Sequence, residues 1–256
     1  MWFFRNFILV KKLLLFLCIL LAACSDDRPT VEVMVLPGLH QYHESNPNYS
    51  VEELFAQIRR FRPDYIGVEI RPVDLNRETS ELMEFYPDEM VRVRDSFPEI
   101  VTGIDFYSPD TEELPVSSEL FNDSLSDMGR ALRLFTKMAA DREYTAARLQ
   151  AGIDELQQEQ LKIIRVASPG EMMTGRFDSL TAVYYNRLYA LMEERGYGGA
   201  ADFNRQRDER IAQRALALVR ANPDKRGLLL VGASHRHRLV KTLREAFPNL
   251  VIAGQN

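Results

Sequence analysis

The chain has 256 residues, of which 46% are hydrophobic, and its formal net charge at pH 7 is −5. This length allows one domain to bury a sizeable hydrophobic core. Acidic side chains outnumber basic ones, and the sequence predicts no basic face of the kind that binds nucleic acid.

The first 23 residues have the layout of a bacterial signal peptide. Arg5, Lys11 and Lys12 form a positive region, and the uncharged apolar run Leu13–Ala23 follows. The sequence LAAC, which ends at Cys24, resembles the lipobox of exported bacterial lipoproteins, in which small residues expose the bond before the cysteine to a peptidase. We therefore expect cleavage before Cys24 and a lipid on that cysteine, which would tether the protein to a membrane.

Two alternatives explain the N-terminus less well. A transmembrane anchor needs about 20 apolar residues, and Lys11 and Lys12 interrupt the stretch too early. A plain signal peptide leaves Cys24 unexplained. Ser25 follows the cysteine where an aspartate would favour retention in the inner membrane of enterobacteria, so we expect the outer membrane, facing the periplasm. Cys18 leaves with the signal peptide, so the mature chain has no disulfide.

Short apolar, β-branched runs alternate with amphipathic patterns after a tether at residues 24–30. Buried strands are predicted at Val31–Leu36, Tyr65–Ile70, Val101–Phe106, Gly227–Val231 and Leu250–Ala253. Helices are predicted after Ser50 to about Phe61 and at Asp74–Phe85, Asp88–Phe97 and His237–Phe247. This alternation predicts an α/β fold with a mainly parallel central sheet and flanking helices.

Residues 115–222 show helical spacing and no strand pattern. Thr145–Val166 reads as one long helix, and breaks are expected at 168–170 and at 196–199. A structureless stretch of this length is uncommon in a compact domain. We therefore predict a single α/β domain over residues 31–256, with a helical cap at about 115–222 inserted between the third strand and the C-terminal strands.

The four histidines of the chain lie in two short segments, each after a predicted strand. His40 and His43 follow the first strand, and His235 and His237 follow the strand at 227–231. Ligands bind beyond the carboxyl ends of parallel strands, so two neighbouring strands would bring these imidazoles to one crevice. A single segment of this kind is more often an ordinary surface turn, but two of them favour one shared site.

Carboxylates accompany the histidines at this edge of the sheet. Glu69 ends the second predicted strand, although its alternative role is to pair with Arg71 or Arg62. Two imidazoles and a carboxylate suit a divalent ion such as Zn, Mn or Fe, so His40, His235 and Glu69 are the candidate ligands. Residues expected near these ligands or at the surface are His43, His237, Asp105 and Asp208.

A family resemblance rests on these residues. Gly232-Ala-Ser-His235 is a Gly-x-x-His sequence near the C-terminus, and Glu69 stands at a strand end. Together they resemble the TraB/GumN/Tiki-like superfamily, whose wider relatives include the erythromycin esterases and the haem-binding ChaN lipoproteins. The first Gly-x-x-His of that family is matched at His40 by position only, because Pro37 stands where the glycine would be.

The pair Arg207-Asp208 resembles the Arg-Asn or Arg-Asp pair of the same family, although taken alone it is better explained as part of a solvated helix face. The resemblance implies a metal-dependent hydrolase of a peptide or a small-molecule ester. His40 and His235 would hold the ion, Glu69 would be a third ligand or the general base, and Arg207 would steady the oxyanion. A metal-free variant, similar to the erythromycin esterases, would have a histidine activate water directly.

A second reading is a lipoprotein that binds haem or a metal ion without turnover, since histidine also ligates haem iron. Tyr184, Tyr185 and Tyr189 would then stack on the porphyrin, although their helical spacing also fits a core. Haem uptake that depends on the histidines would support this reading, and hydrolysis that a chelator abolishes would support the enzyme.

We expect Cys24→Ala to leave the protein without its lipid and to move it out of the membrane fraction, because paired lipid chains give stable anchoring. Labelling with radioactive palmitate and membrane fractionation measure both effects. Incorporation of palmitate into the Cys24→Ala protein at the wild-type level would refute the lipoprotein assignment.

Overall fold

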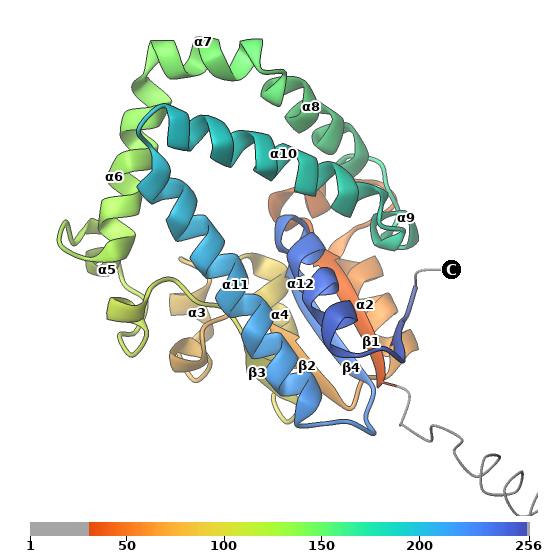
Figure 1. The fold of residues 1–256 in the computed structure, drawn as a ribbon. Helices are drawn as coiled ribbons and strands as arrows, with labels where there is room; N and C mark the ends of the chain where they lie inside the picture. Colours follow the sequence, from red (N-terminus) through yellow and green to blue (C-terminus); the bar gives the residue numbers. More distant parts are fainter. Residues whose placement is uncertain (1–30, 255–256) are drawn as a thin grey trace, which may run out of the picture. The chain divides into compact units, whose positions relative to one another are not determined.

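A five-stranded, all-parallel sheet lies at the centre of the computed structural model, which describes residues 31–254 (Figure 1). Its strands are β1 (Val31–Gly38), β2 (Tyr65–Val68), β3 (Val101–Gly103), β4 (Gly227–Gly232) and β5 (Leu250–Ile252). The strand order is β3-β2-β4-β1-β5. The predicted α/β class with a parallel sheet is therefore confirmed, although β2 and β3 are shorter than expected.

Strands β1 and β4 are direct neighbours, which determines where the histidines lie. Their register pairs Gly38 with Gly232 at the carboxyl end, and β2 lies on the other side of β4. The segments that follow β1, β2 and β4 therefore emerge side by side at one edge of the sheet.

Helices cover both faces of the sheet, because the buried strands carry apolar side chains on each face. Leu36 and Leu230 belong to one core with α2 (Val51–Phe61) and α4 (Asp88–Ser96). The other core lies under α11 (Gly198–Arg220) and α12 (Ala233–Ala246). Ser50 accepts a hydrogen bond from the backbone N–H of Glu53 and so caps α2 where the sequence predicts.

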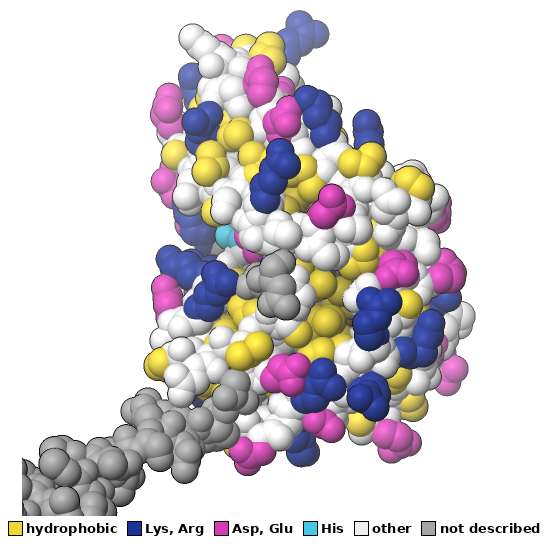
Figure 2. Space-filling model, turned by 90° about the vertical axis from the view of Figure 1, so that its right-hand side faces the viewer, with side chains coloured by type: hydrophobic (Ala, Val, Ile, Leu, Met, Phe, Trp, Pro, Cys, Tyr) yellow, Lys and Arg dark blue, Asp and Glu magenta, His cyan; other side chains and the backbone are white. Residues whose placement is uncertain are grey.

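The segment between β3 and β4 is helical, as predicted, and forms an arm above the sheet (Figure 1). It contains α5 (Ser118–Asn122), α6 (Asp127–Ala140), α7 (Arg142–Gln150), α8 (Ile153–Ile164), α9 (Pro169–Met173), α10 (Arg176–Glu194) and the start of α11. The arm has its own core, which includes Tyr144, Leu191 and Met192. On the face shown in Figure 2, acidic and basic side chains are interspersed, and a histidine is visible where the arm meets the sheet-bearing part.

Three helix predictions are wrong in detail. The helix expected at Thr145–Val166 breaks at Gly152, which has a φ of +66° and separates α7 from α8. The helix expected at Asp74–Phe85 reduces to the 3-10 turn Pro72–Asp74 and the short α3 (Thr79–Leu82).

The third error concerns α12, which begins at Ala233 rather than at His237. His235 and His237 therefore lie on a helix and not in a loop. The break expected at 168–170 is the start of α9, where Ser168 and Glu171 form a capping box.

A fully buried arginine connects α12 to the sheet and to the arm. Arg236 Nε donates to the carbonyl of Val35 at 2.9 Å, and NH2 donates to the carbonyl of Met173 at 3.2 Å. NH1 pairs with Asp178 on α10. The guanidinium is thus bonded to β1, to the end of α9 and to α10 at once.

We expect Arg236→Met to lower the free energy of unfolding by about 3–5 kcal/mol, because Asp178 and two carbonyls would lose a buried partner. Urea denaturation measures the change. Arg238→Met, two residues away with 45% of its side chain exposed, is the control and should cost at most about 1 kcal/mol. Equal effects of the two substitutions would contradict this role for Arg236.

Candidate active site

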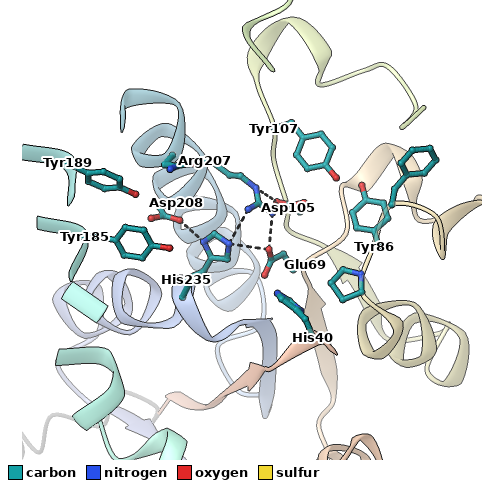
Figure 3. A pocket seen from close by; sticks show the side chains of 14 residues that line it. His40, Glu69, Tyr86, Asp105, Tyr107, Tyr185, Tyr189, Arg207, Asp208 and His235 are labelled. Atoms are coloured by element: carbon teal, nitrogen blue, oxygen red, sulfur yellow. Dashed lines mark hydrogen bonds and ion pairs between the residues drawn. The ribbon is translucent and has the colours of Figure 1, made fainter. Parts of the chain in front are cut away.

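A pocket of about 350 Å³ lies beyond the carboxyl ends of the strands, under the start of α11 (Figure 3). Six of the residues singled out from the sequence line it: His40, Glu69, Asp105, Arg207, Asp208 and His235. Parallel β1, β2, β3 and β4 deliver four of these side chains to the same edge, and α11 supplies the other two. The predicted convergence of the histidine segments is therefore present in the structure.

Arg207 is at the centre of this group. Its NH2 lies 2.8 Å from a carboxylate oxygen of Glu69 and 2.8 Å from one of Asp105. Its Nε donates to Asp105 and to the carbonyl of Phe106, each at 3.1 Å. NH1 contacts His235 Nε2 at 3.0 Å instead of a carboxylate. One guanidinium thus joins the ends of β2 and β3 to α11 and α12.

The charges of this group shift its pKa values in opposite directions. Burial alone would raise the pKa of Glu69, but His235 and Arg207 hold it well below the ordinary value. Burial raises the pKa of Asp105 despite Arg207. Burial would lower the pKa of Arg207, but Asp105 and Glu69 outweigh burial and raise it. At neutral pH, Glu69 and Arg207 are therefore a charged pair.

His235 lies between two carboxylates. Its Nδ1 is 2.5 Å from Asp208 Oδ1, and its Nε2 is 3.2 Å from Glu69 Oε1. Burial and Arg207 oppose a proton on the ring, but Glu69 and Asp208 raise the pKa of His235 to about 10. At neutral pH the ring is an imidazolium that donates to both carboxylates.

His40 occupies a different environment. Its φ is +55°, a left-handed conformation that costs free energy for a residue other than glycine. Glu89 on α4 accepts hydrogen bonds from the backbone N–H of His40 at 3.0 Å and from Nδ1 at 2.9 Å. Among the described residues, His40 Nε2 has no hydrogen-bond partner, and 36% of the side chain is exposed.

Burial would lower the pKa of His40, but the bond to Glu89 and the charges of Glu89 and Glu69 outweigh it and raise the pKa. Glu89 is not among the site residues predicted from the sequence. Its only sequence signal is a carboxylate in the first turn of a helix, where it also stabilises the helix dipole.

Gly232 allows His40 and Glu69 to approach β4 closely. Its backbone N–H donates to Glu69 Oε2 at 2.5 Å. A Cβ at this position would lie 2.8 Å from His40 Nε2 and 3.3 Å from Glu69 Oε2. A side chain at position 232 would therefore displace both groups. This steric constraint explains why a glycine begins the sequence Gly-Ala-Ser-His.

The other two histidines lie outside the pocket. His43 is buried, accepts from the backbone N–H of Leu39 at 3.0 Å and donates to the carbonyl of Tyr49 at 2.7 Å. Burial lowers its pKa, so it is a neutral ring that fixes the turn bearing His40. His237 bonds to the carbonyl of Ser234 at 2.9 Å and stacks on Tyr185.

Aromatic side chains form the walls of the pocket. Tyr86 and Tyr107 lie on one side, and Tyr185 and Tyr189 lie opposite them (Figure 3). Tyr184 lies outside this pocket, in the neighbouring cleft. Arg71, considered as a partner of Glu69, instead pairs with Asp74 at 2.7 Å. The partners of Glu69 are therefore Arg207, His235 and the backbone of Gly232.

A metal ion held by His40, Glu69 and His235 does not fit this arrangement. His235 Nε2 donates to Glu69. Both oxygens of Glu69 accept hydrogen bonds, from Arg207 and from Gly232. Within residues 31–254, no three His, Cys, Asp or Glu side chains are placed to hold a metal ion. The metal site stays a prediction of the sequence.

No family model, curated protein or solved structure matches the chain. Cys24 and the lipobox-like sequence lie outside the described residues. None of the helices in the described part is long and apolar enough to span a membrane.

The pKa of His235 predicts how stability changes with pH. The folded-state pKa of about 10 lies above the ordinary value of 6.5. The contribution of protonated His235 to the free energy of unfolding is therefore fully present below about pH 6.5. It is lost as the pH rises toward 10, by at most about 1.4 kcal/mol per pH unit. Urea denaturation across this range measures the slope.

His235→Gln should remove this component of the slope, and His237→Gln, whose ring pKa is lowered instead, should keep it. Parallel pH profiles for the wild type and His235→Gln would contradict the imidazolium assignment.

Proposed function

We propose that this protein is a hydrolase that cleaves an ester or amide bond by direct attack of water, with His40 as the general base. One observation carries the proposal. Buried Glu89 accepts a hydrogen bond from His40 Nδ1 at 2.9 Å, which leaves Nε2 without a hydrogen-bond partner among the described residues. This nitrogen belongs to a pocket that also contains Arg207 and His235. A ring nitrogen oriented by a carboxylate on its other side is the arrangement that general bases use.

The reaction follows from these charges. Water attacks the carbonyl carbon while His40 Nε2 takes its proton. Glu89 and Glu69 favour the imidazolium that forms, since both raise the pKa of His40. The carbonyl oxygen becomes negative and is stabilised by Arg207, whose NH1 lies against His235 in the pocket. Collapse of the tetrahedral intermediate expels the alcohol or amine, which recovers the proton from His40.

Glu69 has a different role in this scheme from the one expected. Its pKa is low, and it is bonded to Arg207, His235 and Gly232. In this scheme it therefore stays ionised and holds the two cations in place, and it does not accept a proton. The haem-binding alternative would have to rely on His40, because both ring nitrogens of His235 are engaged by other side chains.

Attachment to the cell envelope is part of the proposal. The lipobox-like sequence before Cys24 supports it, and the short tether at 24–30 would hold the domain close to its membrane. We also propose that the chain is related to the TraB/GumN/Tiki-like superfamily. Two observations support this relation: Glu69, Arg207, Asp208 and His235 line one pocket, and Gly232 lies directly against His40 and Glu69.

Hydrolysis of p-nitrophenyl acetate by the full-length protein tests the function. We expect turnover to persist after dialysis against EDTA, and His40→Gln to lower it by about 10²–10⁴-fold, the usual contribution of a general base. His237→Gln, outside the pocket, is the matched control. Turnover that EDTA abolishes and Zn²⁺ restores would support the metal site instead.

Glu89→Gln separates positioning from simple stabilisation. The wild-type kcat/KM should rise with pH through a midpoint above 6.5, because His40 must be neutral and its pKa is raised. Removing the carboxylate leaves burial dominant and should shift that midpoint downward. An unchanged pH profile in Glu89→Gln would mean that Glu89 does not act through His40.

A further inference from the structure

A second cleft opens beside the catalytic pocket and differs from it in chemistry. It has a volume of about 210 Å³ and lies between α8, α10 and the turn after β1. Apart from His40, its walls contain no Asp, Glu, Lys, Arg or His side chain. They combine the apolar residues Leu39, Leu161, Ile164 and Phe177 with uncharged polar ones, namely three tyrosines, two glutamines and Ser234. The catalytic pocket, in contrast, contains three carboxylates and two cations.

The two cavities meet at the proposed general base. His40, Tyr185 and Ser234 line both of them. A molecule whose scissile bond lies at His40 therefore has the charged pocket on one side and the uncharged cleft on the other.

Buried hydrogen bonds fix the walls of the cleft. Gln160 on α8 donates to Thr181 on α10 at 2.8 Å. Asn46 donates to the carbonyls of Ile164 and Ala167, at 2.7 and 2.9 Å, and so attaches the turn after β1 to the end of α8. The cleft therefore exists before a ligand arrives, as in most small-molecule sites.

We propose that this cleft is the acyl-binding subsite of the enzyme and that the substrate carries an uncharged, aliphatic acyl group on the bond that His40 attacks. The inference rests on the proposed hydrolase function. An apolar acyl chain gains free energy by leaving water, whereas a charged group would lose its hydration without a partner of opposite charge in the cleft.

The acyl-chain preference of the full-length protein tests this subsite with p-nitrophenyl acetate, butyrate and hexanoate. In the wild type, kcat/KM should rise about fourfold per added methylene until the cleft is filled. Leu161→Trp should abolish the preference for longer chains, because Leu161 lines the cleft and a larger side chain there would fill it. Leu161→Ala should move the preference toward longer chains.

Leu149→Trp is the matched control, since Leu149 is 59% exposed on α7. A wild type without chain-length preference, or a preference that Leu161→Trp retains, would overturn the subsite. If no ester is hydrolysed, the proposed function fails, and calorimetric binding of hexanamide then decides the subsite alone. Hexanamide should bind the wild type and Leu149→Trp, but not Leu161→Trp; equal binding by all three, or none, would overturn it.

Discussion

The guanidinium of Arg207 is the interaction on which the site depends. Glu69 and Asp105 end neighbouring strands and would repel each other without a cation between them, since both are buried. An uncompensated buried charge costs several kcal/mol, so α11 must bring Arg207 over the edge of the sheet. The helical arm returns to the sheet through α11 and positions this charge, and the same helix carries Asp208, which orients His235.

Much of this architecture could be predicted because its signals are local. Runs such as Leu228–Val231 bury side chains on both faces of the sheet and therefore read as parallel strands. The carboxyl ends of such strands share one edge, so the residues that follow them converge without any knowledge of side-chain contacts. Gly38 pairs with Gly232, so the two histidine segments start from equivalent positions of neighbouring strands. His40 is one residue closer to its glycine and reaches the pocket through a left-handed backbone.

What could not be predicted depends on contacts between distant segments. Glu89 lies 49 residues from His40, and nothing in its helical surroundings distinguishes it from an exposed acid. Residue types also do not reveal which atoms are already engaged. Two imidazoles and a carboxylate at one edge suggest a metal site. The sequence does not show that a guanidinium lies beside Glu69 and His235 and takes the place that the cation would have. The break of the long helix at Gly152, in contrast, has a local cause that the sequence shows: a glycine with positive φ follows the last turn of α7.

The opposite charge states of the two pocket histidines are the final consequence of this arrangement. Both rings lie near Glu69, yet His235 also has Asp208 and stays protonated, whereas His40 has a raised pKa and an Nε2 that no described residue hydrogen-bonds. A base must release its proton near the working pH, and a stabilising cation must not. The pocket already contains three carboxylates against two cations, so an anionic substrate would be repelled. Together with the uncharged cleft on the other side of His40, this balance favours a neutral ester or amide.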